Sequence, residues 1–101
     1  MSLKNQNIVI TGASMGIGAT IAKRLASESA NLILFARSED KLKSIAQECQ
    51  KMQSDIKVHT ASVDVSNHEA LRNAMSNAVD KLGPIDVLVN NAGLALSLIH
   101  I

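Results

Sequence analysis

Reactive aromatic and sulfur-containing side chains are scarce in this sequence of 101 residues. Tyrosine and tryptophan are absent, so the chain offers no phenol that could act as an acid or a base. Its one cysteine, Cys49, cannot form an internal disulfide bond, which fits a reducing, cytoplasmic setting. The three histidines, His59, His68 and His100, lack the spacing of metal ligands, so we expect no metal site.

Charge of one sign and long apolar runs are also lacking. The formal net charge is +1, and no basic cluster indicates a nucleic acid or a membrane surface as a partner. The longest apolar runs span only a few residues, whereas a membrane-spanning helix needs about 20. Residues 1–7 are too polar for a secretory signal. Hydrophobic residues still make up 47% of the chain, which is enough for the core of one domain.

The apolar residues alternate between two periodicities. Short runs of β-branched and aliphatic side chains predict four buried strands, at residues 8–11, 32–36, 57–63 and 85–89. Between these runs, apolar residues recur three or four positions apart, as in helices with one buried face. The inward face expected for the first helix consists of Ile17, Ile21, Ala22, Leu25 and Ala26.

Polar residues and glycine mark the ends of the predicted helices. Ser38 is placed to cap the second helix, and Ser66 with Glu69 forms a capping-box pair at the start of the third. Gly83 and Pro84 end that third helix. Four strands alternating with three helices through short connections predict an α/β fold, a doubly wound parallel sheet with helices on both faces. Right-handed crossovers favour the spatial strand order 3-2-1-4.

The strongest motif is Thr-Gly-Ala-Ser-Met-Gly-Ile-Gly at residues 11–18, between the first predicted strand and the first predicted helix. Glycines there allow backbone angles closed to other residues and leave no side chain in the way of a ligand. The backbone can then approach a diphosphate, whose charge is favoured at the positive end of the helix dipole. The pattern in this context predicts a dinucleotide-binding turn.

This spacing resembles the glycine motif of the short-chain dehydrogenases/reductases. Two further patterns match the same family, Asp64-Val65 after the third strand and Asn90-Asn91-Ala92-Gly93 after the fourth. The three patterns stand in the family's order and span residues 8–93. The resemblance implies a Rossmann-like fold that carries the cofactor-binding half of such an enzyme.

The resemblance also implies roles for individual residues. Glycines of the first motif shape the turn, and its other members contact the phosphates and the nicotinamide ribose. Asp64 accepts a hydrogen bond from the adenine amino group, and the Asn90 motif lines the ribose and nicotinamide. Read without the resemblance, Asp64 is a helix-capping carboxylate and Asn90 a polar strand end. The implied cofactor site comprises Gly12, Ser14, Met15, Gly16, Ile17, Gly18, Arg37, Ser38, Asp64, Val65, Asn90, Ala92 and Gly93.

The end of the second strand indicates NADP as the cofactor. NAD-binding relatives carry a carboxylate there, which binds the ribose hydroxyls and would repel a 2′-phosphate. Ala36 stands at that position and Arg37 follows, whose guanidinium can bind a 2′-phosphate with Ser38 as a further donor. Met15 occupies the place where many NADP-dependent relatives have a basic residue in the glycine turn. The alternative for Arg37 is a solvated charge at a helix start.

The family's catalytic serine, tyrosine and lysine lie beyond the fourth strand, so we predict no catalytic residue in this chain. The resemblance implies hydride transfer between NADP and a carbonyl or secondary alcohol, with a small-molecule substrate and a homo-oligomeric, cytoplasmic parent enzyme. Residues 91–95 resemble the subgroup acting on serine and other 3-hydroxy acids, and 3-oxoacyl-thioester reductases are the nearest rival. A non-catalytic dinucleotide-binding or regulatory module is the alternative, and a truncated gene product without a role is a third.

The sequence predicts one partial NADP-binding domain over residues 1–95, truncated after the fourth strand. The codons of residues 96–101, Leu-Ser-Leu-Ile-His-Ile, can match the end of a transposase adaptor used in DNA library preparation, so we interpret them as a non-native tail. The alternative is a genuine apolar tail. Half of a doubly wound sheet would leave apolar surface exposed around Val87, Leu88 and Val89, which predicts aggregation or marginal stability.

Overall fold

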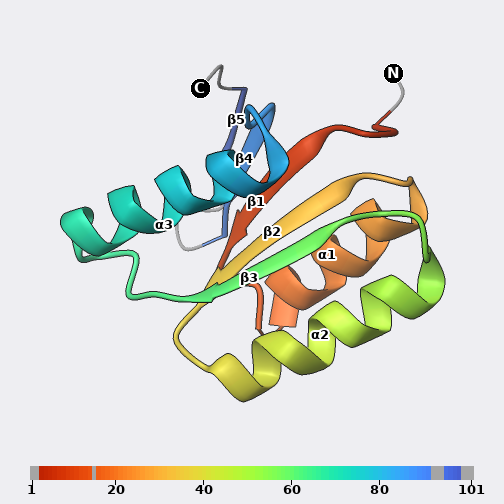
Figure 1. Ribbon diagram of the computed structural model, residues 1–101. Helices are drawn as coiled ribbons and strands as arrows, with labels where there is room; N and C mark the ends of the chain where they lie inside the picture. The colour runs from red at the N-terminus through yellow and green to blue at the C-terminus, as the bar shows by residue number, and fades with distance from the viewer. Residues whose placement is uncertain (1–2, 15, 92–94, 99–101) are drawn as a thin grey trace.

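The computed structural model describes residues 3–14, 16–91 and 95–98, which form a five-stranded sheet flanked by three helices (Figure 1). In chain order the elements are β1 (Asn7–Thr11), α1 (Gly16–Ser27), β2 (Asn31–Ala36), α2 (Glu39–Met52), β3 (Val58–Ser62), α3 (His68–Leu82), β4 (Val87–Asn90) and β5 (Ala95–Leu98). The alternation of strands and helices that the sequence predicted is confirmed for the first seven elements.

The sheet has the order β3-β2-β1-β4-β5. The first four strands are parallel, so the predicted order 3-2-1-4 is confirmed. β5 adds a strand that the sequence did not predict: it pairs antiparallel with β4, with Val87 opposite Leu98 and Asn90 opposite Ala95. This strand includes residues that the sequence assigned to a tail outside the fold.

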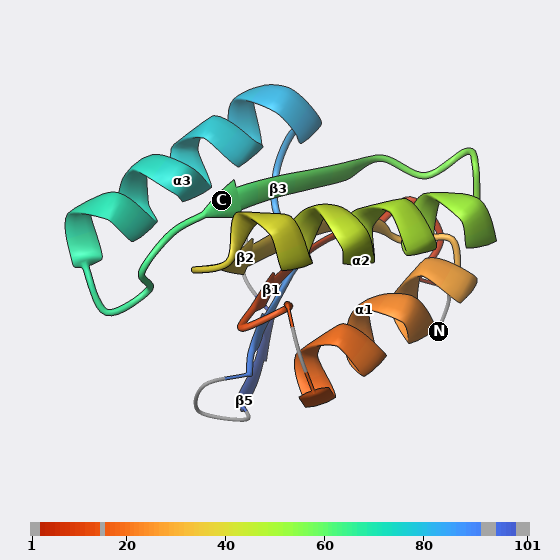
Figure 2. The same ribbon diagram turned by 90° about the horizontal axis from the view of Figure 1, so that it is seen from below.

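Apolar side chains of the central strands alternate between two layers of helices. Ile8 and Ile10 of β1 pack into the layer of α1 and α2, whereas Val9 packs into the layer of α3. All three are at most 1% exposed. Figure 2 shows α3 on one side of the sheet and the other two helices on the opposite side. The predicted doubly wound arrangement is confirmed, and because β1 and β2 are buried on both faces, they contain continuous apolar runs.

The helix ends agree with the sequence at Ser38 and Gly83 but not at Ser66. Ser38 caps α2, its hydroxyl accepting from the Lys41 N–H at 3.4 Å, and Gly83 ends α3. The cap of α3 is Asn67, whose Oδ1 accepts from the Ala70 N–H at 3.1 Å. The predicted capping box is therefore wrong, because the Ser66 hydroxyl is bound elsewhere.

Two expectations about apolar side chains are also wrong. Ile17 does not point into the core but is 59% exposed in the first turn of α1. Val87 is not exposed at an open edge but only 7% accessible, and Leu88 and Val89 are half-buried. The pairing of β5 with β4 covers the edge that the sequence left open.

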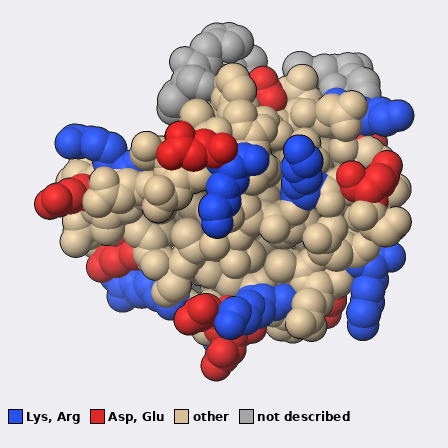
Figure 3. Space-filling view, in the orientation of Figure 1, with Lys and Arg blue, Asp and Glu red and all other residues tan. Residues whose placement is uncertain are grey.

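The surface of the described residues carries mixed charge. On the face in Figure 3, basic and acidic side chains are interspersed. Within the ranges given above, none of the helices has the length and apolar character needed to cross a membrane. The same residues contain no group of three or more histidine, cysteine or acidic side chains placed to hold a metal ion.

Candidate functional site

The turn between β1 and α1 brings two backbone segments into unusually close contact. Gly12 has φ +64°, a left-handed conformation that favours glycine. A Cβ added to Gly18 would lie 2.1 Å from the Gly12 carbonyl oxygen. The first turn of α1 can therefore pack directly against the end of β1 only because residue 18 has no side chain.

Hydrogen bonds fix this turn to both neighbouring strands. The Ala13 N–H donates to the Phe35 carbonyl at 3.1 Å, which ties the turn to the end of β2. The Thr11 hydroxyl accepts from the Asn91 N–H at 3.1 Å and lies 3.2 Å from Asn90 Oδ1. The carboxyl ends of the three central strands are thus held together at one edge of the sheet, where open α/β sheets bind ligands.

A hollow of about 800 Å³ opens at this edge, within the range of roughly 300–1,000 Å³ for small-molecule sites. The glycine turn forms one side, the end of β2 with the start of α2 a second, and the segment after β3 a third. Its lining consists of Gly12, Ser14, Gly16, Ile17, Ala36, Arg37, Ser38, Lys41, Val63, Asp64, Val65, Ser66 and Asn91.

Most of the residues that the sequence assigned to the cofactor site line this hollow. Gly18 supports it from behind through its contact with Gly12. Asn90 does not line it but is exposed at the end of β4, next to Thr11. The remaining predicted residues, Met15, Ala92 and Gly93, lie outside the described residues.

The two residues predicted to recognise opposite ends of the adenosine pair with each other. Arg37 Nη2 lies 3.2 Å from Asp64 Oδ2, and both side chains are substantially exposed. Ser66 donates to Asp64 Oδ1 from its hydroxyl at 2.6 Å and from its backbone N–H at 3.0 Å. Chiefly these Ser66 bonds, and then Arg37, lower the pKa of Asp64 below its ordinary value. Asp64 is therefore an ionised hydrogen-bond acceptor at neutral pH.

The sequence missed Asn91 as a lining residue. Its Nδ2 donates to the Gly12 carbonyl at 3.2 Å, while its Oδ1 is buried without a hydrogen-bond partner in the described part of the chain. The Asn91 amide therefore holds the Gly12 carbonyl in place at the inner end of the hollow. The signal in the sequence was its place inside the motif at residues 90–93.

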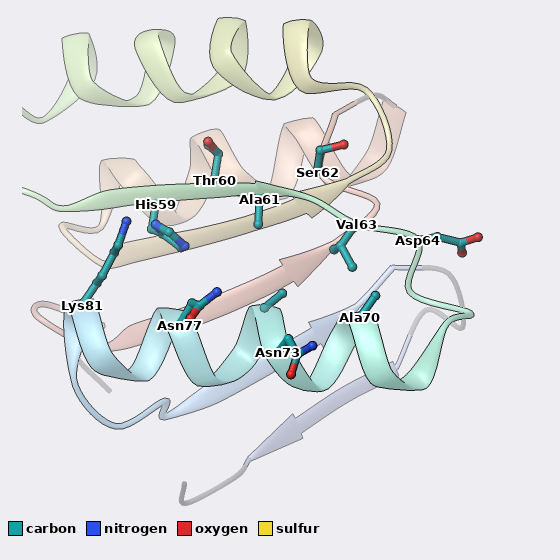
Figure 4. A pocket seen from close by; sticks show the side chains of 11 residues that line it. His59, Thr60, Ala61, Ser62, Val63, Asp64, Ala70, Asn73, Asn77 and Lys81 are labelled. Carbon is teal, nitrogen blue, oxygen red and sulfur yellow. The ribbon is translucent and has the colours of Figure 1, made fainter.

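A second hollow, of about 750 Å³, lies between β3 and α3 and does not include the glycine turn. Figure 4 shows His59 and Lys81 at one end of it, Asn73 and Asn77 along α3, and Asp64 at the other end with its side chain turned away. Burial, and then the charge of Lys81, lower the pKa of His59 below its ordinary value of 6.5. His59 is thus a neutral, half-buried side chain at pH 7.

We expect His59 to make the folded state less stable as the pH falls below about 6.5. Between that value and the lowered pKa of the folded state, the unfolded chain binds more protons, so the free energy of unfolding decreases. Urea unfolding between pH 7.5 and 5.5 measures this. His59→Gln should flatten the dependence, whereas the same change at exposed His68 should leave it intact. An equal slope in both variants would contradict the assignment.

The geometry of the first hollow suits an anionic, adenosine-containing ligand. Its glycine turn leads into the start of α1, and the N-terminus of a helix favours a diphosphate. Asp64 and Arg37 offer an ionised acceptor and a planar cationic donor on the opposite wall.

Comparisons with known proteins agree with this geometry. The sequence pattern of the family described as short chain dehydrogenase matches residues 6–100. Bovine (Bos taurus) 3-ketodihydrosphingosine reductase is 41% identical over 96% of this chain and 30% of its own length.

Solved structures show the same fold. The carveol dehydrogenase of Mycobacterium avium in complex with NAD has a TM-score of 0.84 at 30% identity, covering 95% of this chain and 38% of that one. An alcohol dehydrogenase from the archaeon Thermococcus sibiricus, complexed with 5-hydroxy-NADP, has a TM-score of 0.78 at 36% identity over 84% and 36%.

The chain spans less than half the length of the curated relatives that it matches. Within that span, the family pattern and the fold agree, and the hollow at the carboxyl ends of the parallel strands lies where this kind of sheet binds ligands. The chain belongs to the short-chain dehydrogenase family.

Proposed function

We propose that this chain is the NADP-binding part of an oxidoreductase that transfers hydride between the nicotinamide and a carbonyl or secondary alcohol carbon. The observation that carries the proposal is the glycine turn packed against the first turn of α1, facing a hollow bounded by Arg37 and Asp64. The similarity to a 3-ketodihydrosphingosine reductase supports a carbonyl substrate.

Residues of the hollow fit each part of the dinucleotide. The N–H groups at the start of α1 would bind the diphosphate, whose charge the helix dipole favours. Asp64, held ionised by Ser66, would accept from the adenine amino group. Asn91, whose Nδ2 donates to the Gly12 carbonyl, would hold the glycine turn in place beside the ligand. These residues bind and orient the cofactor.

The preference for NADP over NAD rests on the end of β2. No carboxylate stands at Ala36, which is 6% exposed and lines the hollow. Arg37 follows with a side chain that is 77% exposed at the rim, where a phosphate could approach the guanidinium even while it pairs with Asp64. Solved structures of the same fold contain either NAD or an NADP derivative, so the fold alone supports neither cofactor over the other, and the proposed preference rests on these local charges.

Bound NADP supplies or accepts the hydride, and the proton must come from another part of the enzyme. A phenol next to a lysine does this in the family that the chain resembles, and no tyrosine occurs here. We therefore propose that the chain by itself is inactive. Other parts of the parent enzyme would contribute the acid and the substrate-binding residues, whereas this chain would bind and orient the cofactor.

Titration of both cofactors tests the proposal. We expect the product of the complete reading frame to bind NADPH at least tenfold more tightly than NADH. Arg37→Ala should weaken NADPH about tenfold or more, because a charge-assisted hydrogen bond contributes roughly 1.5–3 kcal/mol. Isothermal titration calorimetry at fixed ionic strength measures both constants.

Arg72→Ala is the matched control, since Arg72 is an exposed arginine on α3 away from this hollow. It should change neither affinity. Equal or tighter binding of NADH by the wild type would overturn the NADP preference. Unchanged NADPH binding by Arg37→Ala would remove Arg37 from the site.

A further inference from the structure

Lys41 lies in the first turn of α2 and lines the same hollow as Arg37 and Ser38. It is not among the residues that the sequence assigned to the cofactor site. Its backbone N–H donates to the Ser38 hydroxyl, which fixes the first turn of the helix at the rim of the site. Two basic side chains thus border one end of the hollow from either side of the cap.

Arg37 is already engaged before any ligand binds. Its guanidinium pairs with Asp64 at 3.2 Å, and its backbone carbonyl accepts from the Ser62 hydroxyl at 2.7 Å. Part of its positive charge is neutralised by a carboxylate that the adenine also needs as an acceptor. A 2′-phosphate that relied on Arg37 alone would have to compete with Asp64 for the guanidinium.

Lys41 has no such competitor among the residues that the structure describes. Its neighbour Lys43 pairs with Glu39 at 3.4 Å and lines a different surface depression. The first turn of α2 contains two carboxylates, Glu39 and Asp40, and Lys43 pairs with the first of them. The charge that remains available to an anion in the hollow on this side is that of Lys41.

We propose that Lys41 is a specificity-determining residue that binds the 2′-phosphate of NADP together with Arg37. The inference rests on the proposed function and adds to it a second cation. That cation takes the place of the basic residue missing from the glycine turn, where Met15 stands. An ammonium on a flexible four-carbon stem can reach the phosphate without displacing Asp64 from Arg37. Asp64 then keeps its contact with Arg37 and can still accept a hydrogen bond from the adenine amino group.

The experiment measures how much the 2′-phosphate contributes to binding, apart from the rest of the cofactor. Adenosine 2′,5′-bisphosphate and 5′-AMP are titrated by calorimetry into the product of the complete reading frame. We expect Lys41→Gln to weaken the bisphosphate roughly tenfold and 5′-AMP less than twofold, since only the former carries a 2′-phosphate. Lys41→Arg should stay within about threefold of the wild type for both.

Lys43→Gln is the matched control, two positions along the same helix and already paired with Glu39. It should bind both nucleotides as the wild type does, and thermal unfolding of each variant verifies that the fold is intact. If the wild type prefers the bisphosphate but Lys41→Gln binds it unchanged, the role of Lys41 is overturned and the NADP preference stands. If the wild type binds both nucleotides equally, the NADP preference fails and the role of Lys41 fails with it.

Discussion

Gly18→Ala is expected to abolish dinucleotide binding. The added Cβ would stand 2.1 Å from the Gly12 carbonyl oxygen, 2.9 Å from its carbon and 3.0 Å from Asn91 Nδ2. Two of these atoms are backbone and cannot rotate away, so α1 must move from the end of β1. Overpacking of this kind costs about 3 kcal/mol. The shift would also displace the N–H groups at the start of α1, which we propose bind the diphosphate.

Gly16→Ala provides the matched control within the same turn. Gly16 has φ +57°, so alanine there is strained, but its Cβ would meet no atom within 4 Å. We expect a loss of about 1 kcal/mol in stability with cofactor binding retained in part. Calorimetric titration of NADPH into both variants, with urea unfolding alongside, gives the comparison. Binding by Gly18→Ala at the wild-type level would show that the close contact is not needed.

The glycine turn could be predicted from sequence because its causes are local. Residues 11–18 contain the whole requirement: a strand end, a backbone that bends, and a helix start without a side chain in the way. The same holds for the buried strands β1 and β2, whose apolar runs record burial on both faces. The strand order could be predicted for a similar reason, because short connections between parallel strands leave few possible sheet topologies.

The pairing of Arg37 with Asp64 could not be predicted, because it depends on where β2 and β3 end relative to each other. These residues are far apart in sequence, and each was assigned to the ligand alone. The cap of α3 was predicted wrongly for a related reason. Ser66 and Asn67 are both suitable caps, but the Ser66 hydroxyl donates to Asp64, and Asn67 caps the helix instead. Where a side chain has several possible partners, the distances in the folded structure determine which of them it binds.

β5 shows a different limit of prediction from sequence. Residues 95–98 contain little beyond apolar side chains and one serine, with no turn motif that marks a hairpin. Their pairing follows from the unpaired edge of β4, whose N–H and C=O groups accept an extended segment whatever its side chains are. An open strand edge thus determines structure that the added segment does not itself specify.

Asn7 connects the amino ends of the strands, and no pattern in the sequence predicted this. Its Nδ2 donates to the carbonyls of Leu82 at 3.0 Å and Pro84 at 2.8 Å, which fixes the end of α3. Its Oδ1 accepts from Asn31 Nδ2 at 3.0 Å, and Asn31 Oδ1 in turn accepts from the Lys57 N–H at 2.9 Å. Two amide side chains therefore bridge β1, β2 and the segments that flank β3 and β4.

Asn7→Leu is expected to destabilise the folded state by about 3 kcal/mol or more. Asn7 is 8% exposed, so the substitution leaves two carbonyls and the Asn31 amide, all in part-buried hydrogen bonds, without this partner, at a cost of roughly 1 kcal/mol for each. Asn7→Asp keeps the size but places a carboxylate against the same carbonyls, so it should be similarly destabilised. Asn77→Leu, at an exposed position on α3, should unfold at nearly the wild-type urea midpoint. If Asn7→Asp unfolded at the wild-type urea midpoint instead, the packing of the Asn7 side chain rather than its donated hydrogen bonds would account for its effect on stability, and the bridge between the strand ends would contribute little.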